Sequence, residues 1–118
     1  MTQVSNEILA AFKAANDKKA LDIVILDVSE VSSFTDTFLI ATGTSNRHVK
    51  TLVDSVELAL KNIAGSPMSI EGLNESNWVL MDYGNLIVHI FDDETRRFYD
   101  LQKLWSDATQ IEVALTIG

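Results

Sequence analysis

The sequence predicts an α/β (α+β) fold, in which a mixed central sheet is flanked by helices in the order α-β-β-α-β-β-β-α. Two observations carry this prediction. Apolar residues recur at helical spacing in three segments, and short apolar or alternating runs typical of strands lie between them. The 118 residues suffice for one core but not for two. We therefore expect a single domain over residues 1–108 and a tail over residues 109–118, which is either an added strand or a frayed end.

The first half of the chain contains two predicted helices and two predicted strands. Residues 4–19 carry apolar side chains at helical spacing and end in two lysines, which favour a helix C-terminus. Residues 21–28 are almost continuously apolar, which indicates a strand buried on both faces, and residues 36–42 predict a second strand. A second helical stripe runs over residues 49–63, and the segment 65–67, which contains glycine and proline, ends it.

The second half predicts three strands and a closing helix. Residues 68–70 form a short strand, and residues 78–81 and 86–91 flank a glycine-containing turn at 82–85, which indicates a hairpin. The last helix is expected over residues 95–108. Its apolar face would consist of Phe98, Leu101, Leu104, Trp105 and Ala108.

The composition excludes several kinds of partner and site. The chain has 17 acidic and 9 basic residues, so its net charge is −8. Nucleic-acid backbones repel such a surface, so we expect no direct contact with DNA, and a basic protein is the better partner. The absence of cysteine excludes disulfides, zinc–thiolate sites and cysteine nucleophiles. The N-terminus lacks a signal-peptide pattern and no apolar run approaches the ~20 residues of a membrane helix, so we expect a cytoplasmic protein without membrane contact.

The segment Gly43–Ser45, between a predicted strand and a predicted helix, is a candidate anion-binding turn. Backbone N–H groups at a helix N-terminus attract phosphate, which makes a nucleotide-binding or nucleotidyltransferase-like enzyme the alternative function. The segment matches neither the phosphate loop G-x-x-x-x-G-K-[ST] nor the motif G-x-G-x-x-G, and Ser45 is a favourable helix N-cap. Arg47 and His48 oppose the helix dipole, so they either pair with a carboxylate such as Asp36 or bind a partner.

Catalysis by nucleotidyl transfer needs carboxylates that hold divalent metals, usually two at alternate positions of one strand. Asp22 and Asp27 are five residues apart, which places them on opposite faces, and Asp54 and Glu57 belong to a helix. We therefore predict no catalytic residues, no metal and no cofactor. His89 lies in the middle of an apolar strand, where a hydrogen-bonded structural histidine is expected.

The aromatic residues of the second half are candidates for binding a protein. Val79 and the residue two positions after it are expected in the core, which leaves Trp78 and Asp82 on the other face of their strand. Tyr83 lies at the predicted hairpin tip, and Tyr99 points away from the apolar face of the last helix. Exposed Trp and Tyr beside carboxylates are typical of protein-binding hot spots. The alternative is that Trp78 is covered by a second helix layer.

Three long segments resemble the ribosomal silencing factor family (RsfS), also called Iojap. They are Thr35–Val49 (TDTFLIATGTSNRHV), Trp78–Phe91 (WVLMDYGNLIVHIF) and Arg96–Trp105 (RRFYDLQKLW), with the pair Glu71–Gly72 between the first two. The resemblance runs from about residue 10 to residue 108. The sequence departs from the family at two positions, where it has Asn85 instead of a common Asp and Thr37 instead of a common aromatic residue.

The resemblance implies a non-enzymatic translation repressor. Family members bind the large ribosomal subunit through its protein number fourteen, block an inter-subunit bridge and keep the small subunit from joining. The family fold resembles a nucleotidyltransferase core without its catalytic carboxylates. The sequence leaves the oligomeric state open, a homodimer included. The positions that match the family's exposed patch are Trp78, Asp82, Tyr83 and Tyr99, whereas the matching positions Asp36, Arg47 and His48 could serve binding or the fold.

Overall fold

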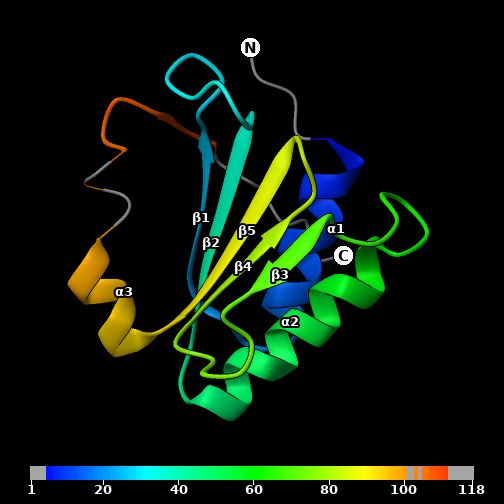
Figure 1. Cartoon of the computed structure of the whole chain (residues 1–118), viewed down its shortest axis with the longest axis vertical. Coiled ribbons are helices and arrows are strands. Elements are labelled where there is room, and N and C mark those ends of the chain that lie inside the picture. The colour runs from blue at the N-terminus through cyan, green and yellow to red at the C-terminus, as the bar shows by residue number, and fades with distance from the viewer. Residues whose placement is uncertain (1–4, 101–102, 104, 112–118) are drawn as a thin grey trace, which may run out of the picture.

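A computed structural model describes residues 5–100, 103 and 105–111 (Figure 1). Within these residues the elements are α1 (Asn6–Asp17), β1 (Leu21–Asp27), β2 (Thr37–Gly43), α2 (Asn46–Leu60), β3 (Ser69–Glu71), β4 (Trp78–Asp82), β5 (Leu86–Asp92), α3 (Asp93–Tyr99) and β6 (Thr109–Ile111). The predicted order of eight elements is confirmed, and β6 follows it. No helix of this part of the chain is long and apolar enough to cross a membrane.

The strands form one mixed sheet in the order β3-β4-β5-β2-β1-β6. Strands β2 and β5 are parallel, and the other neighbouring pairs are antiparallel. This arrangement places β2 and β5 at the centre, where every residue of β2 is buried. Strand β6 pairs with β1, and Ile111 lies opposite Ile25. The first three residues of the predicted tail are therefore part of the sheet.

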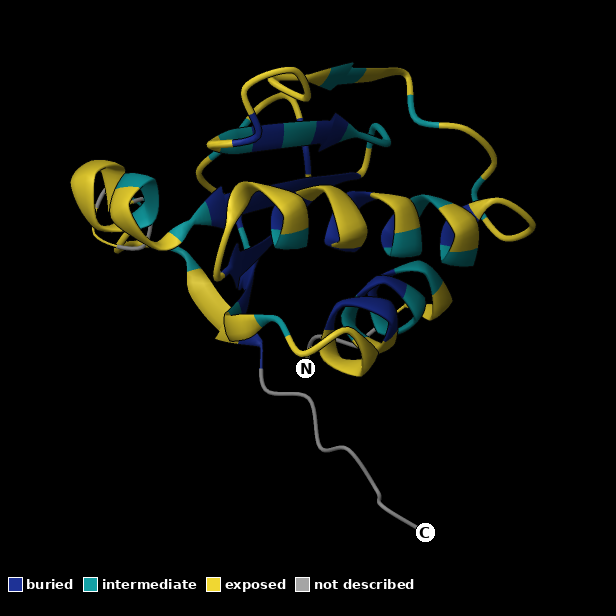
Figure 2. Ribbon diagram, turned by 90° about the horizontal axis from the view of Figure 1, so that it is seen from below, coloured by how far each residue is buried: buried dark blue, intermediate teal, exposed yellow. Residues whose placement is uncertain are grey.

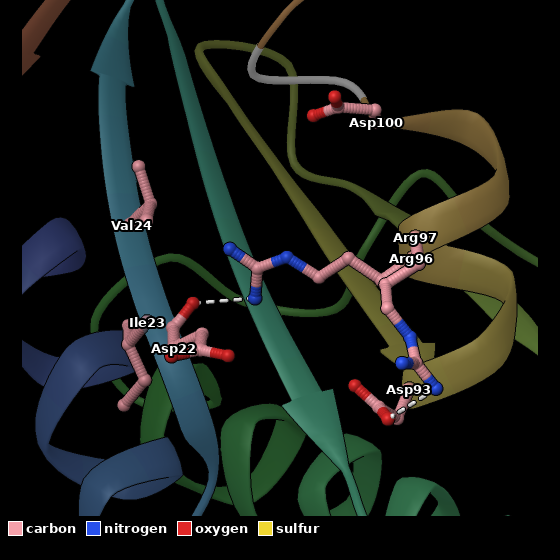
Figure 3. Close-up of a pocket in the computed structure, with 7 residues that line it drawn as sticks. All are labelled: Asp22, Ile23, Val24, Asp93, Arg96, Arg97 and Asp100. Carbon is pink, nitrogen blue, oxygen red and sulfur yellow. Dashed lines mark hydrogen bonds and ion pairs between the residues drawn. The ribbon is translucent and has the colours of Figure 1, made fainter.

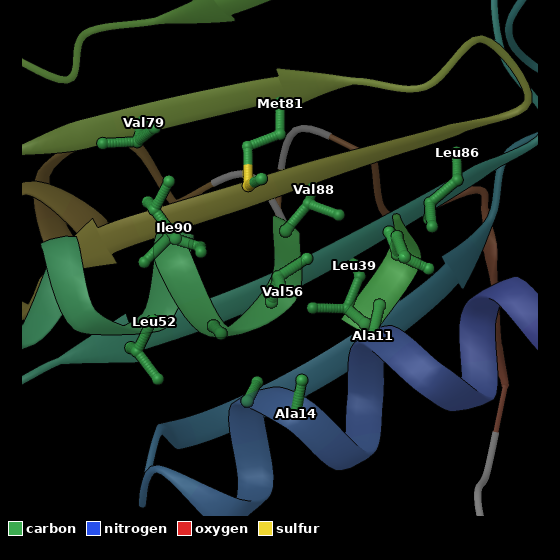
Figure 4. Packing of buried hydrophobic residues seen from close by; sticks show 14 of the residues in the cluster. Ala11, Ala14, Leu39, Leu52, Val56, Val79, Met81, Leu86, Val88 and Ile90 are labelled. Atoms are coloured by element: carbon green, nitrogen blue, oxygen red, sulfur yellow. The ribbon is translucent and has the colours of Figure 1, made fainter. Parts of the chain in front are cut away.

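One face of the sheet is covered by α1 and α2, which lie on the same side of it (Figures 1 and 2). Helix α1 presents the small residues Ala11, Ala14 and Ala15 to this core, so it can approach the neighbouring elements closely. In Figure 4, side chains of α1 and α2 meet those of β2, β4 and β5. The buried strand residues on this face are Ile25, Leu39, Ala41, Val79, Met81, Leu86, Val88, Ile90 and Ile111.

The opposite face of the sheet holds a second, smaller cluster. It consists of Val24, Leu26, Val28, Phe38, Ile40, Ile87 and Phe91, with Trp78, Leu80, Trp105 and Ala108 packed against it. The central strands are therefore buried on both faces, as the continuous apolar runs indicate. The prediction is wrong at the start of β1, because Leu21 and Asp22 are exposed and the pairing with β2 is irregular between Leu21 and Val24.

Two predicted helix ends are wrong. Helix α2 ends at Leu60, and Ile63 is exposed beyond it. Helix α3 ends at Tyr99 instead of residue 108, because Asp100 adopts a left-handed conformation (φ 46°) that turns the chain. As a result Phe98 is 80% exposed rather than in the core. Leu101 and Leu104, also predicted for that apolar face, lie outside the described residues.

Candidate functional site

The Gly43–Ser45 turn is occupied by contacts within the protein. The Ser45 hydroxyl caps α2 by accepting from the His48 N–H at 3.0 Å, and the Thr44 N–H donates to His48 Nδ1 at 2.9 Å. A Cβ on Gly43 would lie 2.9 Å from both Cγ2 and the backbone nitrogen of Val49, so glycine is needed for the close packing of β2 on α2. These contacts engage the N–H groups of Thr44 and His48 and favour a structural turn over a phosphate site.

His48 joins the two helices of the main core. Its Nε2 lies 2.7 Å from the carbonyl oxygen of Lys18, the residue that follows α1. Because that oxygen can only accept, Nε2 carries the proton and Nδ1 accepts from the Thr44 N–H. His48 is thus a half-buried structural residue that connects the end of α1 to the start of α2.

Of the two alternatives for Arg47, an ion pair with a carboxylate such as Asp36 is not formed among the described residues. Asp36 precedes β2 and Arg47 follows it, so the length of the strand, about 3.3 Å for each of its residues, separates them. Both residues are exposed, and Arg47 forms no salt bridge within the part of the chain that the structure describes. Arg47 is therefore available to a partner, unlike His48. In the same part of the chain, no group of three or more His, Asp or Glu residues could hold a metal ion.

Trp78 and Tyr99 come together where β4 meets α3. Their ring centroids are 4.8 Å apart, and the Trp78 ring also stacks on Phe91 at 5.0 Å and 25°. Trp78 is half-buried and Tyr99 is 49% exposed. Trp78 is therefore neither fully exposed nor fully covered, because its ring packs on Phe91 of the sheet and lies beside Tyr99 of α3.

His89 lies beneath this pair, on the face of β5 that also carries Ile87 and Phe91. It is 5% exposed, and its Nδ1 accepts a hydrogen bond of 3.1 Å from the Trp78 indole Nε1–H. Its Nε2 has no hydrogen-bond partner among the described residues. Burial lowers the pKa of His89 to about 4, so the ring is neutral at neutral pH. The hydrogen bond predicted for His89 is present, and the ring is buried as expected.

The other two predicted contact residues lie away from the Trp78–Tyr99 pair. Asp82 Oδ1 accepts from the Gly84 N–H at 2.8 Å and so forms the hairpin turn. Tyr83 was expected to be exposed, which is wrong: it packs on the core that faces α1 and α2, opposite the face of Trp78. Its buried hydroxyl has no partner among the described residues, and burial, with the nearby Glu57 carboxylate, raises the pKa of Tyr83 to about 12.

A groove of about 510 Å³ opens beside Trp78 and Tyr99, and we call it the aromatic groove. It is lined by Glu75, Asn77, Trp78, Asp92, Glu94, Thr95, Phe98 and Tyr99. The lining carries three carboxylates and no cationic side chain. The sequence pattern assigns Phe98 to the core instead, and it singles out none of the three carboxylates. The ring centroid of Phe98 lies 5.1 Å from that of Tyr99, so the three aromatic side chains form a continuous surface from β4 to α3.

Arg96 attaches α3 to the sheet (Figure 3). Its guanidinium donates to the carbonyl oxygen of Asp22 and, at 2.6 Å, to the hydroxyl of Thr42. These contacts join α3 to β1 and β2, and so they place Tyr99, three residues further on, next to Trp78. Sequence reasoning did not single out Arg96, because its partners lie 54 and 74 residues away.

The comparisons with known proteins agree with this fold. Residues 2–117 match the family model described as "Ribosomal silencing factor during starvation". The chain is 34% identical over 103 residues to the ribosomal silencing factor RsfS of Halalkalibacterium halodurans, covering 87% of this chain and 88% of that protein. It is 37% identical over 98 residues to RsfS of Bacillus subtilis, covering 83% of each. A crystal structure of a Chromobacterium violaceum protein is 33% identical, with a TM-score of 0.84 over 98% of this chain and 95% of that one.

Proposed function

Because the chain belongs to the ribosomal silencing factor family, we propose that it is a non-enzymatic repressor of translation that binds the large ribosomal subunit. It acts by binding protein number fourteen of that subunit and by occupying the place of an inter-subunit bridge, so that the small subunit does not join. The observation that carries this proposal is the aromatic pair of half-buried Trp78 and exposed Tyr99 at the rim of an acidic groove.

The shape of this surface suits a protein partner. Phe98 is 80% and Tyr99 is 49% exposed, and large aromatic side chains that cluster in this way supply most of the energy at protein interfaces. Trp78 is held from behind by the sheet, so little ordering is required when a partner docks. The residues expected at the interface are therefore Trp78, Phe98 and Tyr99, with Asp82 and Tyr83 in a structural role.

The charge of the surface favours a basic protein over RNA. The groove carries three carboxylates, and the whole chain has a net charge of −8. Ribosomal RNA would be repelled, whereas a basic ribosomal protein would be attracted and steered towards the groove. This complementarity supports a ribosomal protein as the direct contact within the subunit.

Steric exclusion requires persistence and no chemical step. The bound protein need only remain in place while subunits would otherwise join, so slow dissociation is the property on which repression depends. The alternative, a nucleotide-dependent enzyme at the Gly43–Ser45 turn, is disfavoured because Thr44 and Ser45 already bond to His48.

The direct test adds the protein to purified, salt-washed bacterial ribosomal subunits and follows 70S formation on a sucrose gradient. We expect free subunits to accumulate and the protein to co-sediment with the large subunit. Unchanged 70S formation would refute the proposal. Calorimetric titration with ATP and GTP in the presence of magnesium provides a second arm, in which tight binding abolished by Arg47→Ala would favour the enzyme instead.

A double variant tests the surface. Trp78→Ala with Tyr99→Ala is expected to weaken co-sedimentation by at least about tenfold, because each ring belongs to the proposed hot spot. The matched control is Leu58→Ala with Met68→Ala, which removes two apolar side chains that are 73% and 76% exposed outside the groove. Equal binding of the two double variants, with circular dichroism showing both folded, would exclude the aromatic groove as the interface.

A further inference from the structure

The orientation of the Trp78 ring depends on a single polar contact. Its ring stacks on Phe91 and makes a tilted contact with Tyr99, and such apolar contacts are less directional than a hydrogen bond. The hydrogen bond from Nε1 to His89 Nδ1 is different, because it is directional and is lost if the indole flips. The position of the indole edge relative to the groove is therefore determined by His89.

The sheet register makes this contact possible. Trp78 lies opposite Phe91 in the β4–β5 pairing, and His89 lies two residues before Phe91, opposite Leu80. Trp78 and His89 are thus diagonal neighbours on one face, a separation that long aromatic side chains can bridge. The His89 ring is itself fixed by the edge-to-face contact with Phe38, with centroids 4.8 Å apart at 84°.

Histidine is less favourable for stability at this buried position than an apolar residue would be. The flanking residues on the same face of β5, Ile87 and Phe91, are apolar, and the site is almost fully buried. Nδ1 is bonded to Trp78, but Nε2 has no hydrogen-bond partner among the described residues. A buried polar atom without a partner destabilises the folded state, and an apolar side chain would avoid that cost. What histidine provides at this position, and an apolar side chain would not, is the hydrogen bond to Trp78.

We propose that His89 is a positioning residue for partner binding, whose Nδ1 fixes the Trp78 indole in the orientation that the partner contacts. This inference rests on the proposed function, in which Trp78 belongs to the docking surface. It gives His89 an effect on binding although its side chain does not reach the surface.

Two substitutions separate the loss of the hydrogen-bond acceptor from the loss of the histidine ring. Asparagine places its Oδ1 near the position of Nδ1, so His89→Asn retains an acceptor for the indole, whereas His89→Leu has a similar volume and none. We expect His89→Asn to bind purified large subunits within about threefold of the unmodified protein, and His89→Leu to lose about tenfold. Leucine also removes the unpartnered buried nitrogen, so we expect His89→Leu to unfold at a higher urea concentration than His89→Asn. Binding and stability should therefore change in opposite directions.

A double-mutant cycle and a direct readout complete the test. In a Trp78→Phe background the ring has no N–H, so His89→Leu should cause no further loss of binding. In ¹H–¹⁵N spectra, recorded with Trp105→Phe so that one indole signal remains, the Trp78 Nε1–H should shift and exchange faster with solvent in His89→Leu than in His89→Asn. If the unmodified protein binds and the leucine and asparagine variants bind equally well, the positioning role is refuted. If the unmodified protein fails to bind, the proposed function fails, and the indole signal still decides whether His89 orders Trp78.

Discussion

Because His89 is buried and neutral in the folded protein, we expect it to lower the stability of the fold in acid. Burial lowers its pKa to about 4 in the folded protein, whereas an unfolded histidine has a pKa of about 6.5. Between these values the unfolded chain binds one more proton than the folded chain, so stability falls as pH decreases from about 6.5 and levels off below about 4. The difference of about 2.5 pKa units corresponds to about 3 kcal/mol of unfolding free energy.

The perturbation that isolates this effect is His89→Leu, which removes the titrating group and leaves the other histidine and all carboxylates in place. We expect the unfolding free energy of the unmodified protein to fall, relative to that of His89→Leu, by about 3 kcal/mol between pH 7 and pH 4. Urea titrations at pH 7, 6, 5 and 4 with linear extrapolation give both curves. Most of the relative change should fall between pH 6 and 4.

Parallel curves for the two proteins would refute this reasoning, because they would show that His89 protonates with the same pKa in the folded and unfolded states. A relative change in the opposite direction, with the histidine protein gaining stability in acid, would show that the folded protein prefers the imidazolium. Either outcome would require a partner for Nε2 that neutralises the effect of burial.

Three further substitutions test single contacts. Gly43→Ala is expected to cost about 1–3 kcal/mol in urea unfolding, because the new methyl group would meet the Val49 backbone nitrogen at 2.9 Å, and an unchanged midpoint would contradict this close approach. Tyr83→Phe should leave stability unchanged or raise it by up to about 1 kcal/mol, since the buried hydroxyl has no partner among the described residues, and a marked loss would reveal one. Arg96→Met should speed hydrogen exchange in α3, because it removes the contacts of Arg96 with Asp22 and Thr42. The control Arg97→Met removes only an exposed ion pair worth ~0–1 kcal/mol and should not speed exchange. Equal exchange in the two variants would refute the anchoring role of Arg96.

The central strands could be predicted from their continuous apolar runs, and the two faces of β4 could be predicted because burial alternates along it. Val79 and Met81 face α1 and α2, whereas Trp78 and Leu80 face the other side, as expected. Extending the same alternation by two residues would have placed Tyr83 with Val79 and Met81. The prediction that Tyr83 is exposed followed instead from its place at a hairpin tip, and packing on the helix side overrode that tendency.

The end of α3 could not be predicted, since the apolar spacing continues across the break. Asp100 adopts a left-handed backbone conformation, and Trp105 then packs on Phe38 with ring centroids 5.2 Å apart. A continuous helix and a chain that turns back to the sheet can both place apolar residues at these intervals. The apolar spacing alone therefore does not distinguish the two structures. For this reason Phe98 was assigned to the core although it lies in the candidate interface.

Contacts between distant segments could not be predicted from the sequence either. His48 reaches the carbonyl oxygen of Lys18 across 30 residues, and Arg96 reaches Asp22 across 74. Each residue type was compatible with several roles, and only the folded arrangement shows that His48 serves the fold while Arg47 is exposed. The sequence singles out Trp78 and Tyr99 as separate contact candidates, and only the attachment of α3 to the sheet shows that their rings lie side by side.

The two faces of the sheet differ in a way that explains where a partner would bind. On one face, α1 and α2 cover the strands, and His48 and Gly43 hold those helices close to them. On the other face, Trp78, Leu80, Trp105 and Ala108 pack against the smaller apolar cluster. Beside this cluster, Trp78, Phe98 and Tyr99 line the aromatic groove, and Phe98 and Tyr99 are exposed. A protein that docks there would gain affinity by burying aromatic surface that the fold already holds in place.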